Sequence, residues 1–236
     1  MPATHKTDVR ELYRLVHLLP RCCYVTPPRE LPLNGIYFFF ERGELAYCDG
    51  RTVDRVVRVG THRGHNRFRT MICQHYGHAG SRGSDGCASV FRKHVAAAIL
   101  RRADPHERGL GDWLADGGRH FPKLNAQVGE ALCNTFTFTC FRVNETRERL
   151  RLESGLIALL AQHPLGGPSR RWLGRHAVTG EIRSSGLWNV QHLDDEPLAA
   201  ADYRRVELLV LMTLEDTGLH ALADEEADFS VRCRLA

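Results

Sequence analysis

The sequence predicts an α/β domain with a small, mainly antiparallel sheet of at least three strands, flanked by helices. Short runs rich in aromatic and β-branched residues are bounded by turn signals, as strands are. Longer segments repeat leucine and valine at helical spacing. Apolar residues make up 43% of the 236-residue chain and charged residues 25%, which is ordinary for a globular protein that buries a core.

One helix and one strand are predicted in the N-terminal part of the chain. Residues 6–19 place valine, leucine and tyrosine at helical spacing, and Pro20 ends the pattern. A proline-rich loop follows and leads into residues 36–40, an uninterrupted apolar and aromatic run. Such a run predicts a buried strand.

A second strand is predicted over residues 55–60, and it would close a hairpin with the first. Turn signals lie between the two strands at residues 42–44 and 49–50.

Two-residue alternation assigns the faces of this hairpin. On the first strand, Tyr37 is predicted to share a face with Phe39. On the second strand, Val56 is predicted to share a face with Arg58. Whether Tyr37 and Arg58 are neighbours depends on how the strands pair, and alternation alone leaves that open.

Further elements follow downstream. Residues 134–143 alternate threonine with phenylalanine and predict a third strand. Helical spacing of apolar residues predicts four more helices, which cover residues 68–75, 89–102, 146–162 and 199–216. We divide the chain into an N-terminal helix and linker (1–30), a central domain (31–195) and an acidic C-terminal helical extension (196–236).

The net charge of +4 conceals two opposed blocks. Residues 55–102 contain ten lysines or arginines and a single acid, whereas residues 194–228 contain eleven acids and two arginines. A local excess of positive charge suits a polyphosphate partner, because each neutralised phosphate releases condensed counterions. The alternative is a solvated surface on which the two blocks pair with each other.

Cysteine usage and hydropathy indicate the cellular compartment in which the protein is expected. Eight cysteines are spread through the chain without a secretory signal at its start, so reduced thiols are expected. No run approaches the roughly 18 consecutive apolar residues of a membrane span. We expect a cytoplasmic protein with no membrane partner, and the sequence does not indicate its oligomeric state.

Short sequence motifs occur at particular places in this order of elements. A Gly-Ile-Tyr tripeptide ending at Tyr37 opens the first strand, Val-Gly follows Arg58 at the end of the second, and Glu153 lies in a later helix. Gly-Ile-Tyr alone is weak evidence, but this spacing with a basic helix in between is difficult to assemble by chance. Over residues 33–162 the chain resembles the GIY-YIG nuclease family, and the resemblance implies a GIY-YIG-like fold.

The resemblance also implies a metal-dependent endonuclease that hydrolyses DNA phosphodiester bonds. In a GIY-YIG-type mechanism Tyr37 takes a proton from the attacking water. Glu153 holds a divalent cation, Mg²⁺ or Mn²⁺, because hard cations prefer oxygen ligands. A guanidinium stabilises the charge that develops on the phosphoryl oxygens.

The sequence departs from the family pattern in two places, and both concern this guanidinium. Arg58 replaces the first tyrosine of the second motif. The family's helical arginine lies four residues before a histidine or tyrosine, and it falls on Met71 if His75 is that residue. We name Arg69 as the arginine that acts on the phosphate and Arg58 as a second catalytic cation from the sheet.

The basic segment supplies the candidates for holding nucleic acid, which are Arg67, His75, Arg92 and Lys93. DNA is the expected partner. If none of the arginines reaches the phosphate, the alternative is a catalytically inactive nucleic-acid-binding module with the same fold.

A zinc-stabilised interaction protein is the third hypothesis. Cys73, His75, His78 and Cys87 lie within fifteen residues, and all four are good zinc ligands. Their types interleave, whereas most zinc sites combine a close cysteine pair with a close histidine pair.

Overall fold

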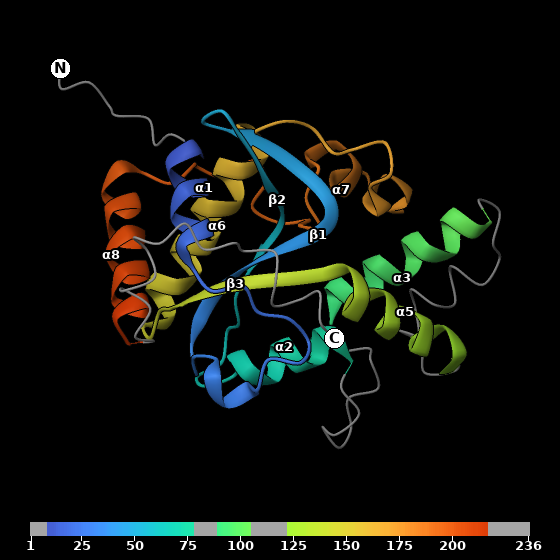
Figure 1. The fold of residues 1–236 in the computed structure, drawn as a ribbon, viewed down its shortest axis with the longest axis horizontal. Helices are drawn as coiled ribbons and strands as arrows, with labels where there is room; N and C mark the ends of the chain where they lie inside the picture. The colour runs from blue at the N-terminus through green and yellow to red at the C-terminus, as the bar shows by residue number, and fades with distance from the viewer. Residues whose placement is uncertain (1–8, 78–88, 105–121, 217–236) are drawn as a thin grey trace.

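The computed structural model describes residues 9–77, 89–104 and 122–216. Within them an antiparallel three-stranded sheet has the order β2-β1-β3, with helices on both faces (Figure 1), which confirms the predicted α/β class. The elements are α1 (Val9–Leu18), β1 (Gly35–Cys48), β2 (Arg51–Gly60), α2 (Phe68–Tyr76), α3 (Val90–Ala103), α5 (Pro122–Thr135), β3 (Phe136–Arg142), α6 (Thr146–Gln162), α7 (Gly180–Ser185) and α8 (Ala200–Asp216), with 3₁₀ turns at Pro28–Glu30 and Leu173–His176.

Two helices were not predicted from the sequence. In α5 the buried residues Val128 and Leu132 recur at helical spacing, but Gly129 between them weakens the helical signal. Gly129 packs against Arg92, because a Cβ atom there would lie 3.5 Å from Arg92 Nη2. The short helix α7 lies in a segment whose glycines and serines predict a loop.

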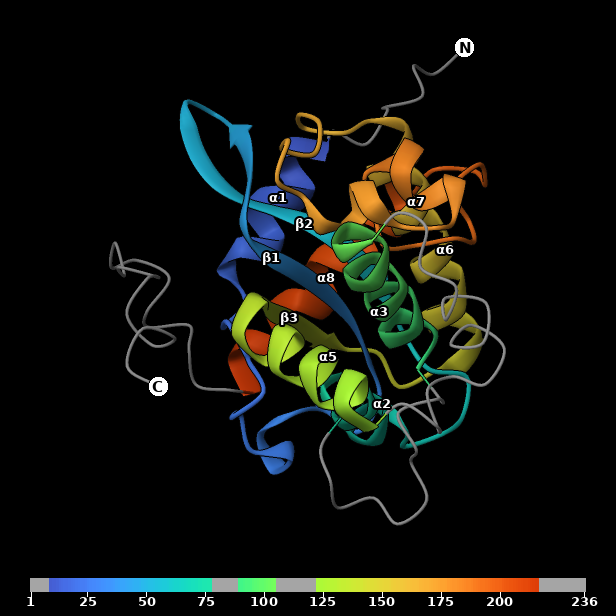
Figure 2. The ribbon, with the colours of Figure 1, turned by 90° about the vertical axis from the view of Figure 1, so that its right-hand side faces the viewer.

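The β1–β2 hairpin is longer than predicted. Its tight turn consists of Asp49 and Gly50, both at positive φ (50° and 80°), as hairpin turns of two residues require. The turn predicted at residues 42–44 is wrong, because these residues lie within β1 as a bulge, where the register shifts and Gly43 adopts a φ of 87°. The hairpin arm therefore projects beyond the helices (Figure 2).

A second irregularity sets the direction of Arg58. Phe39 pairs with Arg58 and Phe40 pairs with Val56, so β2 contributes an extra residue, Val57, at this point. Val56 packs on one face of the sheet, and Val57 packs with Phe39 on the other. The prediction that Val56 and Arg58 share a face is wrong, because the bulge interrupts the alternation.

Two hydrophobic cores lie on opposite faces of the sheet. Helices α1, α6 and α8 pack on the face that carries Ile36 and Phe38, and α2, α3, α5 and the segment 172–188 pack on the face that carries Tyr37 and Phe39. Figure 2 shows α3 and α5 in front of β1 with α1 and α8 behind. Since α1 and α8 share a core with β1, the described parts of both predicted extensions pack against the central domain. No described helix has the length and apolar character needed to cross a membrane.

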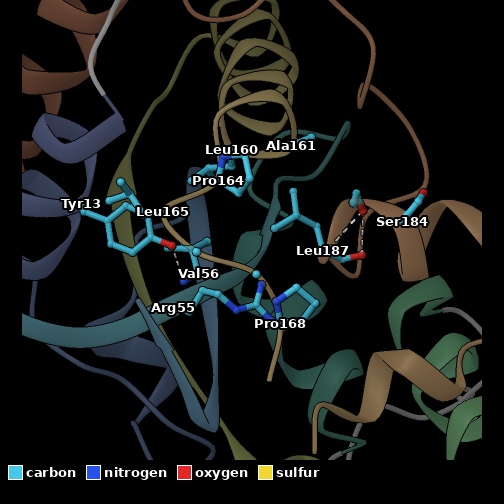
Figure 3. Close-up of a pocket in the computed structure, with 13 residues that line it drawn as sticks. Tyr13, Arg55, Val56, Leu160, Ala161, Pro164, Leu165, Pro168, Ser184 and Leu187 are labelled. Atoms are coloured by element: carbon cyan, nitrogen blue, oxygen red, sulfur yellow. Dashed lines mark hydrogen bonds between the residues drawn. The ribbon is translucent and has the colours of Figure 1, made fainter. Parts of the chain in front are cut away.

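A buried ion pair fastens the segment between α6 and α8 to the sheet. Arg55 Nη2 lies 2.7 Å from Glu44 Oε2, and these side chains are 5% and 3% exposed. Glu44 also accepts a hydrogen bond from Ser169 N, and Arg55 Nη1 donates to Gly186 O over 2.6 Å. Figure 3 shows Arg55 beside Pro168 in the small cavity, about 140 Å³, over which this segment closes.

We predict that Arg55→Leu strongly destabilises the fold. The substitution leaves the Glu44 carboxylate buried without its cation, which costs about 3–5 kcal/mol of unfolding free energy. Urea denaturation followed by tryptophan fluorescence measures the loss, since Arg55 lies over the ring of Trp172. Arg51→Leu, at an exposed position of the same strand, should change stability by no more than about 0.5 kcal/mol. Equal stabilities of the two variants would contradict the assigned role of Arg55.

Candidate active site

Tyr37 lies at the centre of the candidate site, on the face of β1 that α2 and α3 cover. Its side chain is 1% exposed. Arg58 Nε donates to the Tyr37 hydroxyl over 3.1 Å, and this hydroxyl lies 2.9 Å from His75 Nε2. A Cβ atom at Gly60, the strand partner of Tyr37, would lie 2.2 Å from the same hydroxyl. The glycine that ends the second motif is thus what leaves room for the phenol.

His75 extends this hydrogen-bonded chain to α3. Its Nδ1 lies 2.7 Å from Ser89 Oγ, the N-cap of α3, which also accepts a hydrogen bond from Arg92 N. Burial, helped by the charge of Arg58, lowers the pKa of His75 well below its usual range, so the imidazole is neutral. The ring is buried and both nitrogens are engaged inside the protein, so the contact of His75 with nucleic acid stays a prediction that this geometry does not favour. Its position makes it a partner of Tyr37 instead.

Arg58 connects Tyr37 to the segment after α7. Its Nη1 donates to Trp188 O over 2.7 Å, and its guanidinium lies 5.1 Å from the centre of the Phe91 ring. Within the described part of the chain, Nη2 makes no hydrogen bond. A half-buried guanidinium with one nitrogen uncommitted is well suited to bind a phosphate oxygen.

Glu153 reaches this cluster from the opposite face of the sheet. Its helix, α6, packs on the face away from Tyr37, but the carboxylate extends to the end of the edge strand β2, where Oε1 accepts a hydrogen bond from Thr61 N over 2.9 Å. Thr61 Oγ1 in turn donates to Gly35 O, which ties the end of β2 to the start of β1. Glu153 is therefore held beside the start of the first motif and the end of the second.

The charges of this cluster act on one another. Burial raises the pKa of Tyr37, the charge of Arg58 opposes this rise, and the charge of Glu153 adds to it. Burial likewise raises the pKa of Glu153, and Arg58 again opposes the rise. Arg58 thus lies between a phenol and a carboxylate and favours the ionised form of each.

The carboxylate of Glu153 fits a hard divalent cation. Oε1 is bonded to Thr61 N, and Oε2 makes no hydrogen bond within the described part of the chain. No group of three or more histidine, cysteine, aspartate or glutamate residues suited to a metal occurs among the described residues. A single carboxylate suits Mg²⁺, which keeps several waters, better than it suits Zn²⁺, which takes three or four protein ligands.

The candidate zinc ligands are only partly described. His78 and Cys87 lie outside the described residues. His75 uses both ring nitrogens for Tyr37 and Ser89, so it has none left for a metal. Burial raises the pKa of the Cys73 thiol, which disfavours the thiolate that zinc requires.

Arg69 does not join the cluster. Its Nε donates to Leu31 O over 2.8 Å and its Nη2 donates to Arg29 O over 3.1 Å, so the guanidinium is committed to the loop that precedes β1. Met71, one turn before His75, is half-buried against the core. The structure therefore brings Arg58 to the phenol and carboxylate and directs Arg69 away from them.

Arg92 is buried between helices and holds them together. Its side chain is 4% exposed, and it donates to Tyr76 O on α2 and Asn125 O on α5. Its guanidinium is buried where it joins three helices, so the contact of Arg92 with nucleic acid stays a prediction that this position does not favour. Lys93 is half-buried and Arg67 is exposed at the start of α2. Their contacts with nucleic acid remain predictions.

Sequence reasoning missed two residues that build the site. Ser89 orients His75, and Asn189 fastens β2 by accepting from Val59 N and donating to Val59 O. The available signals were a serine directly before a predicted helix and a Trp-Asn pair in a glycine-rich segment. Neither signal indicates which distant residue the side chain contacts.

A family model described as "GIY-YIG domain" matches residues 5–211. The chain belongs to the GIY-YIG domain family. No curated protein and no solved structure matches it. The match runs from the region of α1 into α8, so it includes the sheet and all of the clustered side chains. Membership of this family indicates nuclease activity in general.

We predict that His75 makes stability depend on pH. Its pKa is low in the folded state and near 6.5 in the unfolded state, so the unfolded state binds the extra proton. The stability is fully present above that value and falls as the pH drops below it, by up to about 1.4 kcal/mol per pH unit for one proton. His75→Gln should make the slope of unfolding free energy between neutral and mildly acidic pH shallower by about one proton.

The matched control for this prediction is His163→Gln, which removes an imidazole from an exposed position. Urea denaturation at a series of pH values gives both slopes. A wild-type slope in the His75→Gln variant would mean that His75 takes up a proton in the folded protein, against the assignment of a neutral ring.

Proposed function

We propose that this GIY-YIG domain is a metal-dependent endonuclease that hydrolyses DNA phosphodiester bonds. The observation that carries the proposal is the convergence of Tyr37, Arg58 and Glu153 at the end of the edge strand β2. A phenol, a guanidinium and a carboxylate are the groups that such a hydrolysis uses to accept a proton, stabilise the phosphoryl oxygens and hold a cation.

Tyr37 is the base that takes the proton of the attacking water. At rest its phenol is protonated, since burial raises its pKa. Arg58 Nε can only donate, so the phenolic proton points to Nε2 of His75. When the phenol ionises, it releases this proton to solvent, because the low pKa of His75 keeps the imidazole neutral. The resulting phenolate keeps the hydrogen bond from Arg58 and accepts a proton from the attacking water.

In the proposed mechanism, Arg58 contacts the phosphate and Glu153 would hold the cation. Nη2 of Arg58 donates to a non-bridging oxygen, where its charge stabilises the transition state more than the ground state. Glu153 would hold the cation, and Thr61 N fixes the position of its carboxylate through Oε1. A bound Mg²⁺ or Mn²⁺ would supply Lewis-acid activation of the phosphoryl group and would neutralise the carboxylate whose charge raises the pKa of Tyr37.

A catalytically inactive nucleic-acid-binding module is the second candidate function, and two observations favour it. Met71 stands where the family has its helical arginine, and it is half-buried against the core. Tyr37 is 1% exposed, so an attacking water reaches its hydroxyl only beside Arg58 or after that side chain moves. The two candidates differ in a single observable, the cutting of DNA.

We predict that the protein nicks supercoiled plasmid DNA in the presence of Mg²⁺ or Mn²⁺. Tyr37→Phe removes the base and should lower the rate about 10²–10⁴-fold. Glu153→Gln should abolish the response to the metal. The matched control is Tyr47→Phe, because Tyr47 is 68% exposed on the hairpin arm. Gel analysis of nicked and closed circles measures each rate.

The same assay separates the two candidate functions. If the wild-type protein binds DNA in a salt-sensitive manner but leaves the plasmid intact at every concentration of either metal, the protein is the inactive module. Equal loss of nicking in the Tyr37→Phe and Tyr47→Phe variants would count against the assigned base.

The identity of the catalytic arginine is a separate prediction. Arg58→Lys keeps the charge but loses the planar fork, and we expect a fall in the nicking rate of about 10²–10³-fold with little change in DNA affinity. Arg69→Lys should retain most of the nicking rate, since Arg69 donates to backbone carbonyls away from the cluster. Comparing single-turnover rates at saturating protein isolates the chemical step. The reverse ranking of the two variants would restore Arg69 as the catalytic residue.

A further inference from the structure

The loop between β2 and α2 presents unpaired positive charge beside the candidate site. Arg63 and Arg67 are exposed, and neither side chain makes a hydrogen bond or ion pair within the described part of the chain. On the α6 and α8 side of the molecule, by contrast, three arginines are paired with acids. These pairs are Arg151 with Asp202, Arg205 with Glu148, and Arg142 with Asp216.

These pairs bear on the two charge blocks of the sequence. Asp202 and Asp216 belong to the acidic block, and their partners Arg151 and Arg142 lie outside the basic block of residues 55–102. Asp202 and Asp216 of α8 thus neutralise charge on their own side of the sheet. The charge of the β2–α2 loop stays available to an external anion.

The loop is held in one conformation from beneath. Asn34 Nδ2 donates to Asn66 Oδ1 over 2.9 Å, and Asn66 N donates back to Asn34 Oδ1 over 2.7 Å. Asn66 has a φ of 55°, a conformation that asparagine tolerates better than most residues. The carbonyl of the buried His62 accepts from Nε and Nη2 of Arg149, both over 3.2 Å. A loop fixed in this way loses little conformational entropy when it binds.

The loop also starts at the candidate site. Thr61, whose N–H bonds the Glu153 carboxylate, is its first residue, and Arg63 follows two positions later. The positive charge of Arg63 contributes to keeping Glu153 ionised against the effect of burial. An anion that binds at Glu153 through a cation therefore lies close to Arg63 as well.

We propose that the loop of residues 61–67 binds the phosphodiester backbone of the DNA strand that is cut, with Arg63 and Arg67 contacting phosphates next to the scissile one. The proposal rests on the proposed function, because it assigns the surface that delivers the strand to that site. Guanidiniums on a rigid loop bind phosphate oxygens without sequence preference, so they set affinity and position rather than specificity.

Salt dependence of DNA binding tests the loop. A short fluorescein-labelled DNA duplex is titrated with protein in EDTA at several salt concentrations, and anisotropy gives the affinity. Each arginine that no longer neutralises a phosphate should lower the slope of log affinity against log salt by about 0.9, so the Arg63→Gln, Arg67→Gln double variant should reduce it by about 1.8. The Arg63→Lys, Arg67→Lys double variant keeps the charges and should retain most of the slope.

Two further variants make the test specific. The Arg42→Gln, Arg51→Gln double variant removes the same charge from exposed positions on the hairpin arm and should keep the wild-type slope. Asn66→Gly retains both loop arginines and the positive φ but removes the bond from Asn34. It should lower affinity at every salt concentration without changing the slope, because it loosens the loop and leaves its charges in place.

The outcomes separate the loop from the reaction. Loop variants that bind with wild-type affinity and slope overturn the loop proposal, and plasmid nicking by the wild type would leave the endonuclease in place. Weaker and less salt-sensitive binding by the loop variants, together with no nicking by any protein, supports the loop and overturns the endonuclease. A hairpin-arm variant whose slope falls as far as that of the loop variant overturns the assignment to residues 61–67.

Discussion

The close approach of the Tyr37 hydroxyl to the backbone of Gly60 is the contact on which the site depends. It places a phenol against the end of β2, where any side chain at position 60 would displace it. Arg58 Nε and His75 Nε2 then complete the surroundings of this oxygen. Each is anchored in turn, Arg58 by Trp188 O and His75 by Ser89 Oγ, so the phenol has one position available to it.

The segment after α6 supports this arrangement from a distance. Trp188 Nε1 donates to Glu41 Oε2 in β1, and the buried Glu44–Arg55 pair binds both Ser169 and Gly186. The carbonyl of Trp188 is thereby placed to receive Arg58. Residues distant from Tyr37 along the chain consequently decide where the Arg58 guanidinium points, which is the usual division between a site and its supporting shell.

Arg58 is the arginine that the structure brings to Tyr37, and it lies on the edge strand β2. Met71, on α2, is half-buried against the core. From β2 the guanidinium acts on the phenol and the carboxylate together, since its charge favours the ionised form of both. The loop that follows β2 adds exposed arginines on the same side, and the acids of α8 are paired elsewhere.

The sequence by itself determined the α/β class, the three strands, most of the helices and the family, because hydrophobic periodicity and motif order are local properties of the chain. Tyr37 and Glu153 were named from those motifs. Only the tertiary structure decided the face of Arg58, since a bulge at Val57 reverses an alternation that the sequence predicts. It also separated Arg58 from Arg69, because hydrogen bonds between residues distant along the chain set the direction of a long, flexible side chain, and no local pattern encodes them.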